Sequence, residues 1–186
     1  IPIILPYNMT EHEIQGLSKQ IKFSLIISSW KKLKNINFYK TTTCPIEELS
    51  HTSSGCSIKE IGESLDKNET QVMLLTSGTT GLPKIVELTA NNFIYSAKAW
   101  NKIINFKKTD FYLCSLPLSH IGGLSIIIRS LIYQFRISLI DTFDNAEIIN
   151  QLDNGINLIS LVPSMMHELI EYKDKFQYIK KLKAII

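Results

Sequence analysis

Hydroxyl groups, glycines and a lysine are concentrated in one short segment, Thr76-Ser77-Gly78-Thr79-Thr80-Gly81-Leu82-Pro83-Lys84. Glycines let backbone N–H groups approach an anion, the hydroxyls add hydrogen-bond donors, and the lysine adds a compact positive charge. Phosphate oxygens are the ligand that suits this mixture best. The spacing differs from that of a Walker loop, because two residues separate Gly78 from Gly81 and Pro83 precedes Lys84. The alternative is a connecting loop, rich in serine and glycine, that binds nothing.

A histidine lies in a second candidate segment, Ser115-Leu116-Pro117-Leu118-Ser119-His120-Ile121-Gly122-Gly123-Leu124. It stands between an apolar run typical of a strand and a pair of glycines. In α/β folds, ligands bind in loops beyond the carboxyl ends of strands. His120 is therefore a candidate site residue. The alternative is a histidine that only hydrogen-bonds its own loop.

Arg129 is the one charged residue in the apolar run from Leu124 to Tyr133. Burying a guanidinium without a partner is costly, so we expect an anion beside it. Two alternatives stay open: a pair with an internal aspartate or glutamate, and a position on the solvent side of an amphipathic helix.

The elements that position these residues alternate regularly from Gln71 onward. Strands are predicted at 72–76, 85–88, 111–116, 136–140, 158–162 and from about 182, and helices at 90–104, about 124–133, 146–153 and 163–172. Thr89 suits the N-cap of one helix, and Pro163 suits the first turn of another. Strands separated by helices indicate an α/β layer fold with a largely parallel sheet.

The leading part of the chain is less regular and offers no catalytic constellation. A helix is predicted from Glu11 to Lys34 on the spacing of its apolar residues, followed by turn signals from Thr41 to Gly55. Ser57 is a predicted cap of a short helix through Leu65. We therefore divide the chain into a variable leading segment, 1–69, and an α/β core, 70–186.

Composition excludes several classes of function. The formal net charge is +3, and the lysines form short groups without interleaved aromatic residues, which favours solvated helix ends over nucleic-acid binding. The three cysteines form no C-x-x-C pair, which indicates reduced thiols and argues against a disulfide frame or a zinc site. We assign no metal ligand. No apolar run reaches the roughly 18 to 20 residues of a membrane span, since Arg129 interrupts the longest.

The first candidate segment resembles the phosphate-binding loop of the adenylate-forming enzymes, which include acyl-CoA synthetases, luciferases and the adenylation domains of peptide synthetases. His120 lies in a Leu-Pro-Leu-x-His-x-x-Gly pattern similar to that of acyl-CoA synthetases, at a matching separation. The resemblance covers roughly residues 66–186 and implies a layered αβαβα-type amino-terminal domain. It implies ATP, Mg²⁺ and coenzyme A, with catalytic roles for Lys84 and His120, the histidine shaping the acyl pocket. It also implies that the β- and γ-phosphates are bound by Thr76, Ser77, Gly78, Thr79, Thr80, Gly81 and Lys84.

Two further runs, Gly123–Tyr133 and Leu158–Met166, are similar to segments of o-succinylbenzoate–CoA ligases of menaquinone and phylloquinone biosynthesis. This resemblance implies activation of o-succinylbenzoate through an acyl-adenylate to its CoA thioester. One carboxylate of that substrate reacts, and Arg129 with Ser160 would hold the other. The alternatives are another acyl- or aryl-CoA synthetase and a non-catalytic nucleotide-binding remnant of the family.

The chain departs from the family pattern in three places. Ile85 replaces a glycine, Ala90-Asn91-Asn92 replaces the commoner His-x-Asn, and the sequence ends at Ile186. Relatives continue into an adenine-binding turn, a magnesium-binding glutamate, a ribose-binding aspartate and a C-terminal domain with a catalytic lysine. We therefore expect an amino-terminal fragment that is inactive alone. The expected partner is a small carboxylic acid, with neither nucleic acid nor a membrane span, in the cytoplasm or plastid stroma. The oligomeric state is left open, a homo-oligomer included.

Overall fold

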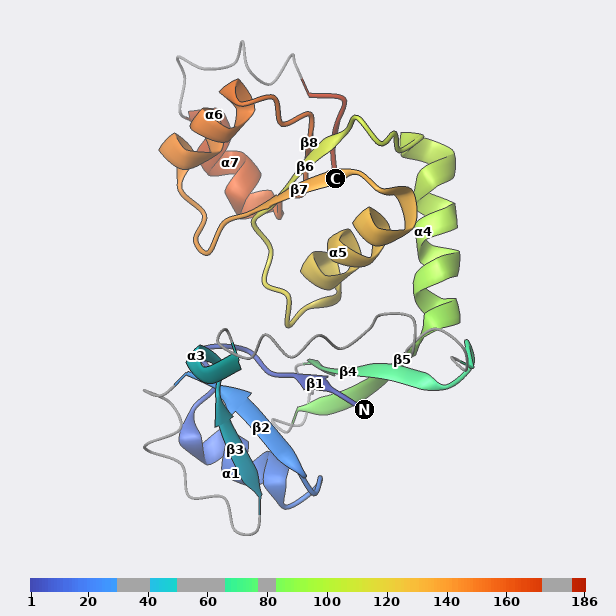
Figure 1. Ribbon diagram of the computed structural model, residues 1–186. Helices are drawn as coiled ribbons and strands as arrows, with labels where there is room; N and C mark the ends of the chain where they lie inside the picture. The colour runs from blue at the N-terminus through green and yellow to red at the C-terminus, as the bar shows by residue number, and fades with distance from the viewer. Residues whose placement is uncertain (30–40, 50–65, 77–82, 172–181) are drawn as a thin grey trace. The chain divides into compact units, whose positions relative to one another are not determined.

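The computed structural model describes residues 1–29, 41–49, 66–76, 83–171 and 182–186. The chain forms two compact units, one of Tyr7–Leu65 and one that joins Ile1–Pro6 to Asp66–Ile186. Figure 1 labels the elements of both units, apart from the short last strand next to the C-terminus. All candidate site residues fall in the larger unit.

A parallel sheet of four strands, in the order β7-β6-β8-β9, forms the centre of the larger unit (Figure 1). Its strands are β6 (Phe111–Cys114), β7 (Arg136–Leu139), β8 (Leu158–Ile159) and β9 (Ala184–Ile185). Each neighbouring pair is parallel. The helices that connect and flank these strands are α4 (Ala90–Ile104), α5 (Ile121–Tyr133), α6 (Asn145–Asp153) and α7 (Pro163–Glu171). The predicted α/β arrangement with a parallel sheet is confirmed.

Alternate residues of β6 face opposite sides of this sheet, as the pleat of a strand requires. Tyr112 and Cys114 belong to a core cluster with Ile126 of α5, against which residues of α4 pack. Leu113 belongs to a second cluster, with Ile148 of α6 and with α7. Helices therefore cover both faces of the sheet, and a buried polar group on β6 lies next to either α5 or α6.

Local sequence explains where the helices begin. Thr89 caps α4: its Oγ1 accepts from the backbone N–H of Asn92 at 3.2 Å, and the Asn92 side chain accepts from the Thr89 N–H at 2.8 Å. This reciprocal pair satisfies two backbone donors that the first turn leaves free. The predicted N-cap is confirmed, and helix α4 has the predicted bounds. Asp144 caps α6 through a single bond of this kind, its side chain accepting from the Glu147 N–H at 2.8 Å.

A second, smaller sheet holds the ends of the first candidate segment. Strands β4 (Thr70–Thr76) and β5 (Lys84–Thr89) pair antiparallel, and β1 (Ile3–Ile4) pairs parallel with β4. The two longer strands were predicted, although their antiparallel pairing and separation into another sheet were not. Two apolar runs joined by a short segment form a hairpin more readily than a parallel pair, which requires a long crossover.

The unit Tyr7–Leu65 corrects one prediction. Its elements are α1 (Glu11–Ser18), β2 (Leu25–Ser28), β3 (Thr42–Pro45) and α3 (Ile46–Leu49), with β2 and β3 pairing parallel. The helix predicted over 11–34 was therefore wrong from residue 19 to residue 29, and its last part, 30–34, lies outside the described residues. Its second half contains the run Leu25-Ile26-Ile27, in which β-branched residues favour a strand. The helix predicted from Ser57 to Leu65 lies outside the described residues.

Within the larger unit the predicted elements occur with shifted ends. Strands predicted to reach 116, 140 and 162 end at Cys114, Leu139 and Ile159. Helix α5 begins three residues before the predicted 124, and α6 begins one residue before 146. The last strand begins at Ala184, two residues after the predicted start. The apolar runs continue past the paired strands because residues just beyond a strand, such as Ile140 and Leu161, still pack against a core cluster.

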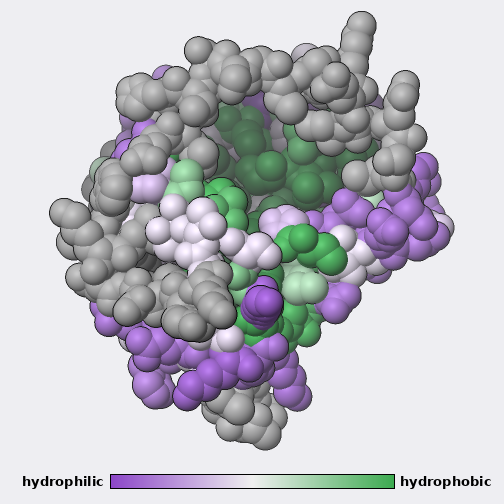
Figure 2. Space-filling model, turned by 60° about the horizontal axis from the view of Figure 1, so that its bottom comes forward, coloured by the Kyte–Doolittle hydropathy of each residue, from purple (hydrophilic) through white to green (hydrophobic). Residues whose placement is uncertain are grey.

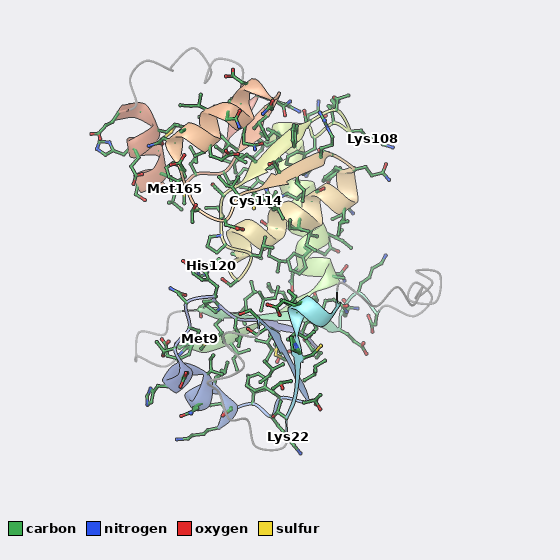
Figure 3. The ribbon with its side chains drawn as sticks, turned by 60° about the vertical axis from the view of Figure 1, so that its left-hand side comes forward. Met9, Lys22, Lys108, Cys114, His120 and Met165 are labelled. Carbon is green, nitrogen blue, oxygen red and sulfur yellow. The ribbon has the colours of Figure 1, made fainter. Side chains whose placement is uncertain are left out.

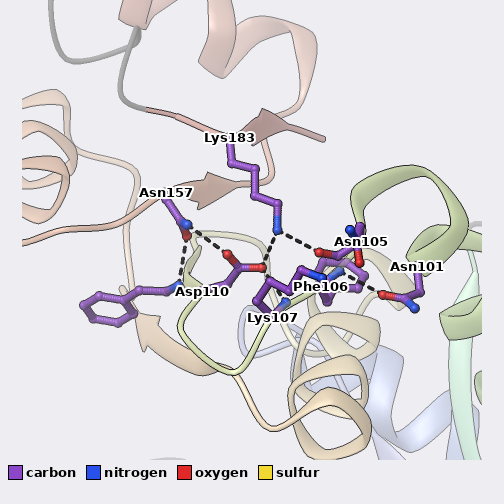
Figure 4. A network of polar contacts seen from close by, with 8 residues as sticks. Asn101, Asn105, Phe106, Lys107, Asp110, Asn157 and Lys183 are labelled. Carbon is purple, nitrogen blue, oxygen red and sulfur yellow. Dashed lines mark hydrogen bonds and ion pairs between the residues drawn. The ribbon is translucent and has the colours of Figure 1, made fainter.

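A buried carboxylate joins the amino-terminal side of the sheet to α4 (Figure 4). Asp110 accepts from the Lys107 N–H at 2.8 Å, from Asn157 Nδ2 at 2.9 Å and from Lys183 Nζ at 2.7 Å. Lys183 also donates to the backbone oxygen of Asn105 at 2.9 Å. These contacts connect the amino-terminal ends of β6, β8 and β9. The candidate site lies at the other ends of these strands. Within the described residues, no helix has both the length and the apolar character needed to cross a membrane.

Candidate functional site

The hairpin formed by β4 and β5 brings together the two ends of the first candidate segment, residues 76–84. Thr76 is the last residue of β4 and Lys84 the first of β5, and they are direct partners in the antiparallel register. The Thr76 hydroxyl donates to the backbone oxygen of Lys84 at 3.4 Å. Both side chains are exposed. The remaining predicted loop residues, Ser77, Gly78, Thr79, Thr80 and Gly81, lie outside the described residues.

A pocket of about 310 Å³ lies where α4 and α5 meet the carboxyl ends of the parallel strands. Its wall includes Trp100 of α4, Ser125 and Arg129 of α5, Ser160 after β8, and Ile186 after β9. Its lining is mostly apolar, with a few polar groups that converge on one side. Such composition and size are typical of small-molecule sites.

Arg129 carries the positive charge of this pocket. Its side chain is 4% exposed, its Nε donates to the Ser125 backbone oxygen at 3.0 Å, and its Nη2 donates to the Ser125 hydroxyl at 2.9 Å. The guanidinium carbon lies 5.4 Å from the centre of the Trp100 ring. Serine and tryptophan thus hold two sides of the guanidinium, the second through a cation–π contact.

The third nitrogen of Arg129 has no partner. Nη1 is buried and makes no hydrogen bond with any residue that the structure describes. Burial lowers the pKa of Arg129, while Tyr112 and Cys114 act in the opposite direction. An arginine in a protein nevertheless stays charged. In the described part of the chain no carboxylate forms an ion pair with Arg129, and the side chain is not on the solvent side. A buried cation with an unpaired nitrogen beside a pocket suits an anion, which would supply the missing partner.

Ser160 lies in the same pocket, so the two residues predicted to act together do meet. Its side chain is 4% exposed, and its Oγ lies 2.8 Å from the hydroxyl oxygen of Tyr112. The backbone oxygen of Ser160 accepts from the Ser115 hydroxyl at 3.3 Å. Burial raises the pKa of Tyr112, so the phenol is neutral at physiological pH. The pocket therefore offers hydroxyl donors as well as the guanidinium.

His120 occupies a different position. It is the N-cap residue of α5, its side chain is exposed, and it makes no hydrogen bond to the first turn of the helix. Figure 3 labels it at the end of the loop that leads from β6 to α5. Among the described residues that line the Arg129 pocket, its neighbours Ile121 and Gly122 are present and His120 is not. Its role near the acyl group stays a prediction.

Sequence reasoning missed three residues of this site. Ser125 and Arg129 are four positions apart on a helix, a spacing that places two side chains on one face and was a readable signal. Trp100 and Tyr112 carry no local signal, because only the packing of α4 and β6 brings them to the guanidinium and to Ser160.

A second pocket, of about 320 Å³, is formed by β4, α4 and α5 and is almost wholly apolar. Its wall includes Val72, Phe93, Leu124 and Ile128. Figure 2 shows hydrophobic residues, in green, on the face turned toward the viewer, with hydrophilic residues, in purple, along part of their border. No charged residue is found among the described residues that line this pocket.

Known proteins resemble this chain in sequence. The model of the family described as "AMP-binding enzyme" matches residues 1–186. The chain is 37% identical over 114 residues to 2-succinylbenzoate–CoA ligase of Bacillus pumilus, covering 61% of this chain and 24% of that protein. It is 39% identical over 113 residues to the enzyme of the same name from Listeria monocytogenes, covering 60% of this chain and 24% of that protein. The chain thus spans about a quarter of the length of these curated relatives.

Solved structures are similar over nearly the whole chain. O-succinylbenzoate coenzyme A synthetase from Bacillus subtilis, in complex with AMP, superposes with a TM-score of 0.81 at 24% identity, covering 98% of this chain and 47% of that one. ATP-bound MatB from Rhodopseudomonas palustris superposes with a TM-score of 0.80 at 16% identity, covering 97% and 38%. These likenesses confirm the predicted fold class, part of the amino-terminal domain of adenylate-forming enzymes. With the family model matching from the first residue to the last, the chain belongs to the AMP-binding enzymes.

Proposed function

We propose that the complete protein carrying this chain is an AMP-forming acid–CoA ligase that activates o-succinylbenzoate, in menaquinone or phylloquinone biosynthesis. The observation that carries the proposal is the Nη1 atom of Arg129, a buried donor beside a pocket of about 310 Å³ that has no partner among the described residues. A substrate with a single carboxylate uses that group for the reaction. A second carboxylate gives the guanidinium the anion it lacks.

The reaction begins with a carboxylate that is already ionised at neutral pH, so it needs little acid–base help. The carboxylate oxygen attacks the α-phosphorus of ATP, which forms an acyl-adenylate and releases pyrophosphate. The thiolate of coenzyme A then attacks the acyl carbon and displaces AMP. The protein's main tasks are to orient the reactants and to neutralise phosphate charge.

The residues present suit those tasks. Thr76 and Lys84 are paired residues on either side of segment 77–81, and both side chains are exposed. The Lys84 ammonium is therefore available to phosphate oxygens, as is the Thr76 hydroxyl once it leaves the backbone oxygen of Lys84. We assign the β- and γ-phosphates to these two residues and to the segment 77–81 between them. Mg²⁺, when bound to the phosphates, supplies further positive charge. His120 is proposed to border the acyl group.

The relatives support the choice of substrate. The proteins that match at 37% and 39% identity are named for 2-succinylbenzoate, and a solved B. subtilis synthetase is named for the same acid with ATP and magnesium ion bound. Arg129 and Ser160 of this chain supply a guanidinium fork and a hydroxyl, the donor set that matches a carboxylate.

The rival proposals predict different substrates. Another acyl- or aryl-CoA synthetase would accept a monocarboxylate as well as a dicarboxylate. A non-catalytic remnant would bind ATP and release no pyrophosphate with any acid.

A pyrophosphate-release assay on the complete protein separates the three. The panel contains o-succinylbenzoate, 4-oxo-4-phenylbutanoate, which lacks the aryl carboxylate, and 2-butanoylbenzoate, which lacks the aliphatic one. We expect o-succinylbenzoate to have the highest kcat/KM, and one monocarboxylate to react weakly because it keeps the reacting group. Equal kcat/KM for the dicarboxylate and a monocarboxylate would contradict the substrate. In the same assay, Lys84→Ala should reduce pyrophosphate release with every acid.

A further inference from the structure

A tyrosine that does not line the pocket contacts it through Ser160. Tyr112, at the centre of β6, is 0% exposed, and its hydroxyl oxygen lies 2.8 Å from Ser160 Oγ. In the described part of the chain, Ser160 is the one hydrogen-bond partner of this hydroxyl. Such a buried phenol cannot turn to water if the contact is lost.

The sheet fixes this contact. Tyr112 is the direct partner of Leu158 in the register of β6 and β8, and Ser160 follows Leu158 by two positions, on the same face. The Tyr112 ring packs against Phe135, with ring centres 5.8 Å apart. The strand register and the packing of the ring together fix the position of the phenol.

The direction of the hydrogen bond depends on what occupies the pocket. Either oxygen can be the donor when the site is considered alone. A carboxylate only accepts, so Ser160 must give its single hydrogen to a carboxylate that it binds. The Ser160 oxygen is then left as an acceptor, which is the role that the Tyr112 hydroxyl requires of its partner. The anion thus aligns a chain of donors from the phenol through the serine to the carboxylate.

We propose that Tyr112 is a positioning residue for recognition of the second carboxylate: its hydroxyl holds the Ser160 hydroxyl so that the serine hydrogen points at the anion bound by Arg129. The inference rests on the proposed function and names one more determinant of its specificity. Tyr112 touches neither substrate nor nucleotide and acts only through Ser160.

The test is Tyr112→Phe in the complete protein, assayed with o-succinylbenzoate and with the monocarboxylate of the panel that still reacts. Loss of one hydrogen bond between neutral hydroxyls corresponds to roughly a 5- to 10-fold change. We expect KM for o-succinylbenzoate to rise by about that factor, with kcat unchanged and KM for the monocarboxylate unchanged. Tyr133→Phe is the matched control, because Tyr133 stacks on Phe106 in the same cluster, with ring centres 5.5 Å apart, and its hydroxyl makes no hydrogen bond within the described residues. It should change neither KM.

A double variant distinguishes positioning from general damage. If Tyr112 acts through Ser160, adding Tyr112→Phe to Ser160→Ala should raise KM for o-succinylbenzoate no further than Ser160→Ala alone. An equal rise in KM for both acids, or full additivity of the two changes, would overturn the inference. If Arg129→Leu lowers the preference for the dicarboxylate and Tyr112→Phe does not, the inference fails and the proposed function stands. If neither variant changes the preference, the proposed function itself fails.

Discussion

Lys183 and Asp110 form an ion pair with 2.7 Å between Nζ and Oδ2, although 73 positions separate them in the sequence. The Asp110 side chain is 3% exposed and that of Lys183 is 30% exposed. Lys183 directly precedes β9, so the pair holds the last strand against the sheet. Ile186, the residue after β9 in the wall of the Arg129 pocket, depends on that position.

Removing the lysine should destabilise the larger unit. Lys183→Met leaves a buried carboxylate with one donor fewer, and we expect a loss of about 1–3 kcal/mol in the free energy of unfolding. Lys108→Met, at an exposed lysine in the turn after α4, is the control and should change it by less than about 0.5 kcal/mol. Urea unfolding measures both. Equal stability of the two variants would contradict a structural role for the pair.

The pair also predicts a pH dependence. Burial by itself raises the pKa of Asp110, but hydrogen bonds from Lys183, from the Lys107 backbone and from Asn157 outweigh it and hold the pKa below its ordinary value. A carboxyl whose pKa is lowered by folding contributes stability above its unfolded pKa, about 4, and loses that contribution as the pH falls through the folded value. The stability difference between the native protein and Asp110→Asn should therefore be full at pH 6 and shrink below pH 4.

Urea titrations at pH 6 and pH 3 measure this difference. Asp141→Asn, at an exposed aspartate, is the control and should show a small difference at both values. A difference for Asp110→Asn that stays constant down to pH 3 would show that the carboxylate charge contributes nothing.

Gly123 should tolerate no side chain. A Cβ at this position of α5 would lie 2.5 Å from the backbone oxygens of Leu116 and Pro117, which cannot move aside as a side chain can. We expect Gly123→Ala to destabilise the protein by about 1–3 kcal/mol and to shift the loop that carries His120. Gly16→Ala is the control in α1, since a Cβ there meets nothing within 4 Å, and it should stabilise by about 0.5–1 kcal/mol. Thermal melting of both variants measures these changes in stability, and a Gly123→Ala variant as stable as the native protein would contradict the close approach.

The cap of α4 should matter for stability and for the pocket, since this helix carries Trp100. Thr89→Ala removes the side chain that accepts from the Asn92 N–H, and we expect a loss of about 1 kcal/mol. Thr89→Ser keeps the hydroxyl and should lose less than half of that. Urea midpoints compare the two, and equal losses would point to the methyl group of threonine rather than to the cap.

The sequence predicted the elements of the parallel sheet because each carries a local signal. Thr89 before an amphipathic run, and the apolar run Phe111–Cys114 after a turn, are readable without a partner. Strand β1 was missed, since Ile3–Ile4 is two residues long and forms only by pairing with β4, about 70 positions away. The helix predicted beyond Ser18 failed because an apolar run of three residues fits both periods, and its pairing with β3 decides the outcome.

The residues of the site also fall into two groups, those that the sequence predicted and those that only the structure identifies. Arg129 was identified because a charge in an apolar run needs an explanation, and Ser160 by resemblance to a family segment. The guanidinium's contacts with Ser125 and Trp100, and the hydrogen bond of Tyr112 to Ser160, arise from the packing of α4 and α5 on β6 and β8. No local pattern in the sequence specifies which phenol or indole will lie there.

The measurement that tests the central claim most directly combines a change in the protein with a change in the substrate. The kcat/KM values for o-succinylbenzoate and for the reactive monocarboxylate are measured in the complete native protein and in Arg129→Leu. We expect the leucine variant to lose at least about tenfold with o-succinylbenzoate, the scale of a charge-assisted hydrogen bond, and little with the monocarboxylate. The preference for the dicarboxylate should then nearly disappear. Equal losses with the two acids, or no loss with either, would contradict a second carboxylate at Arg129.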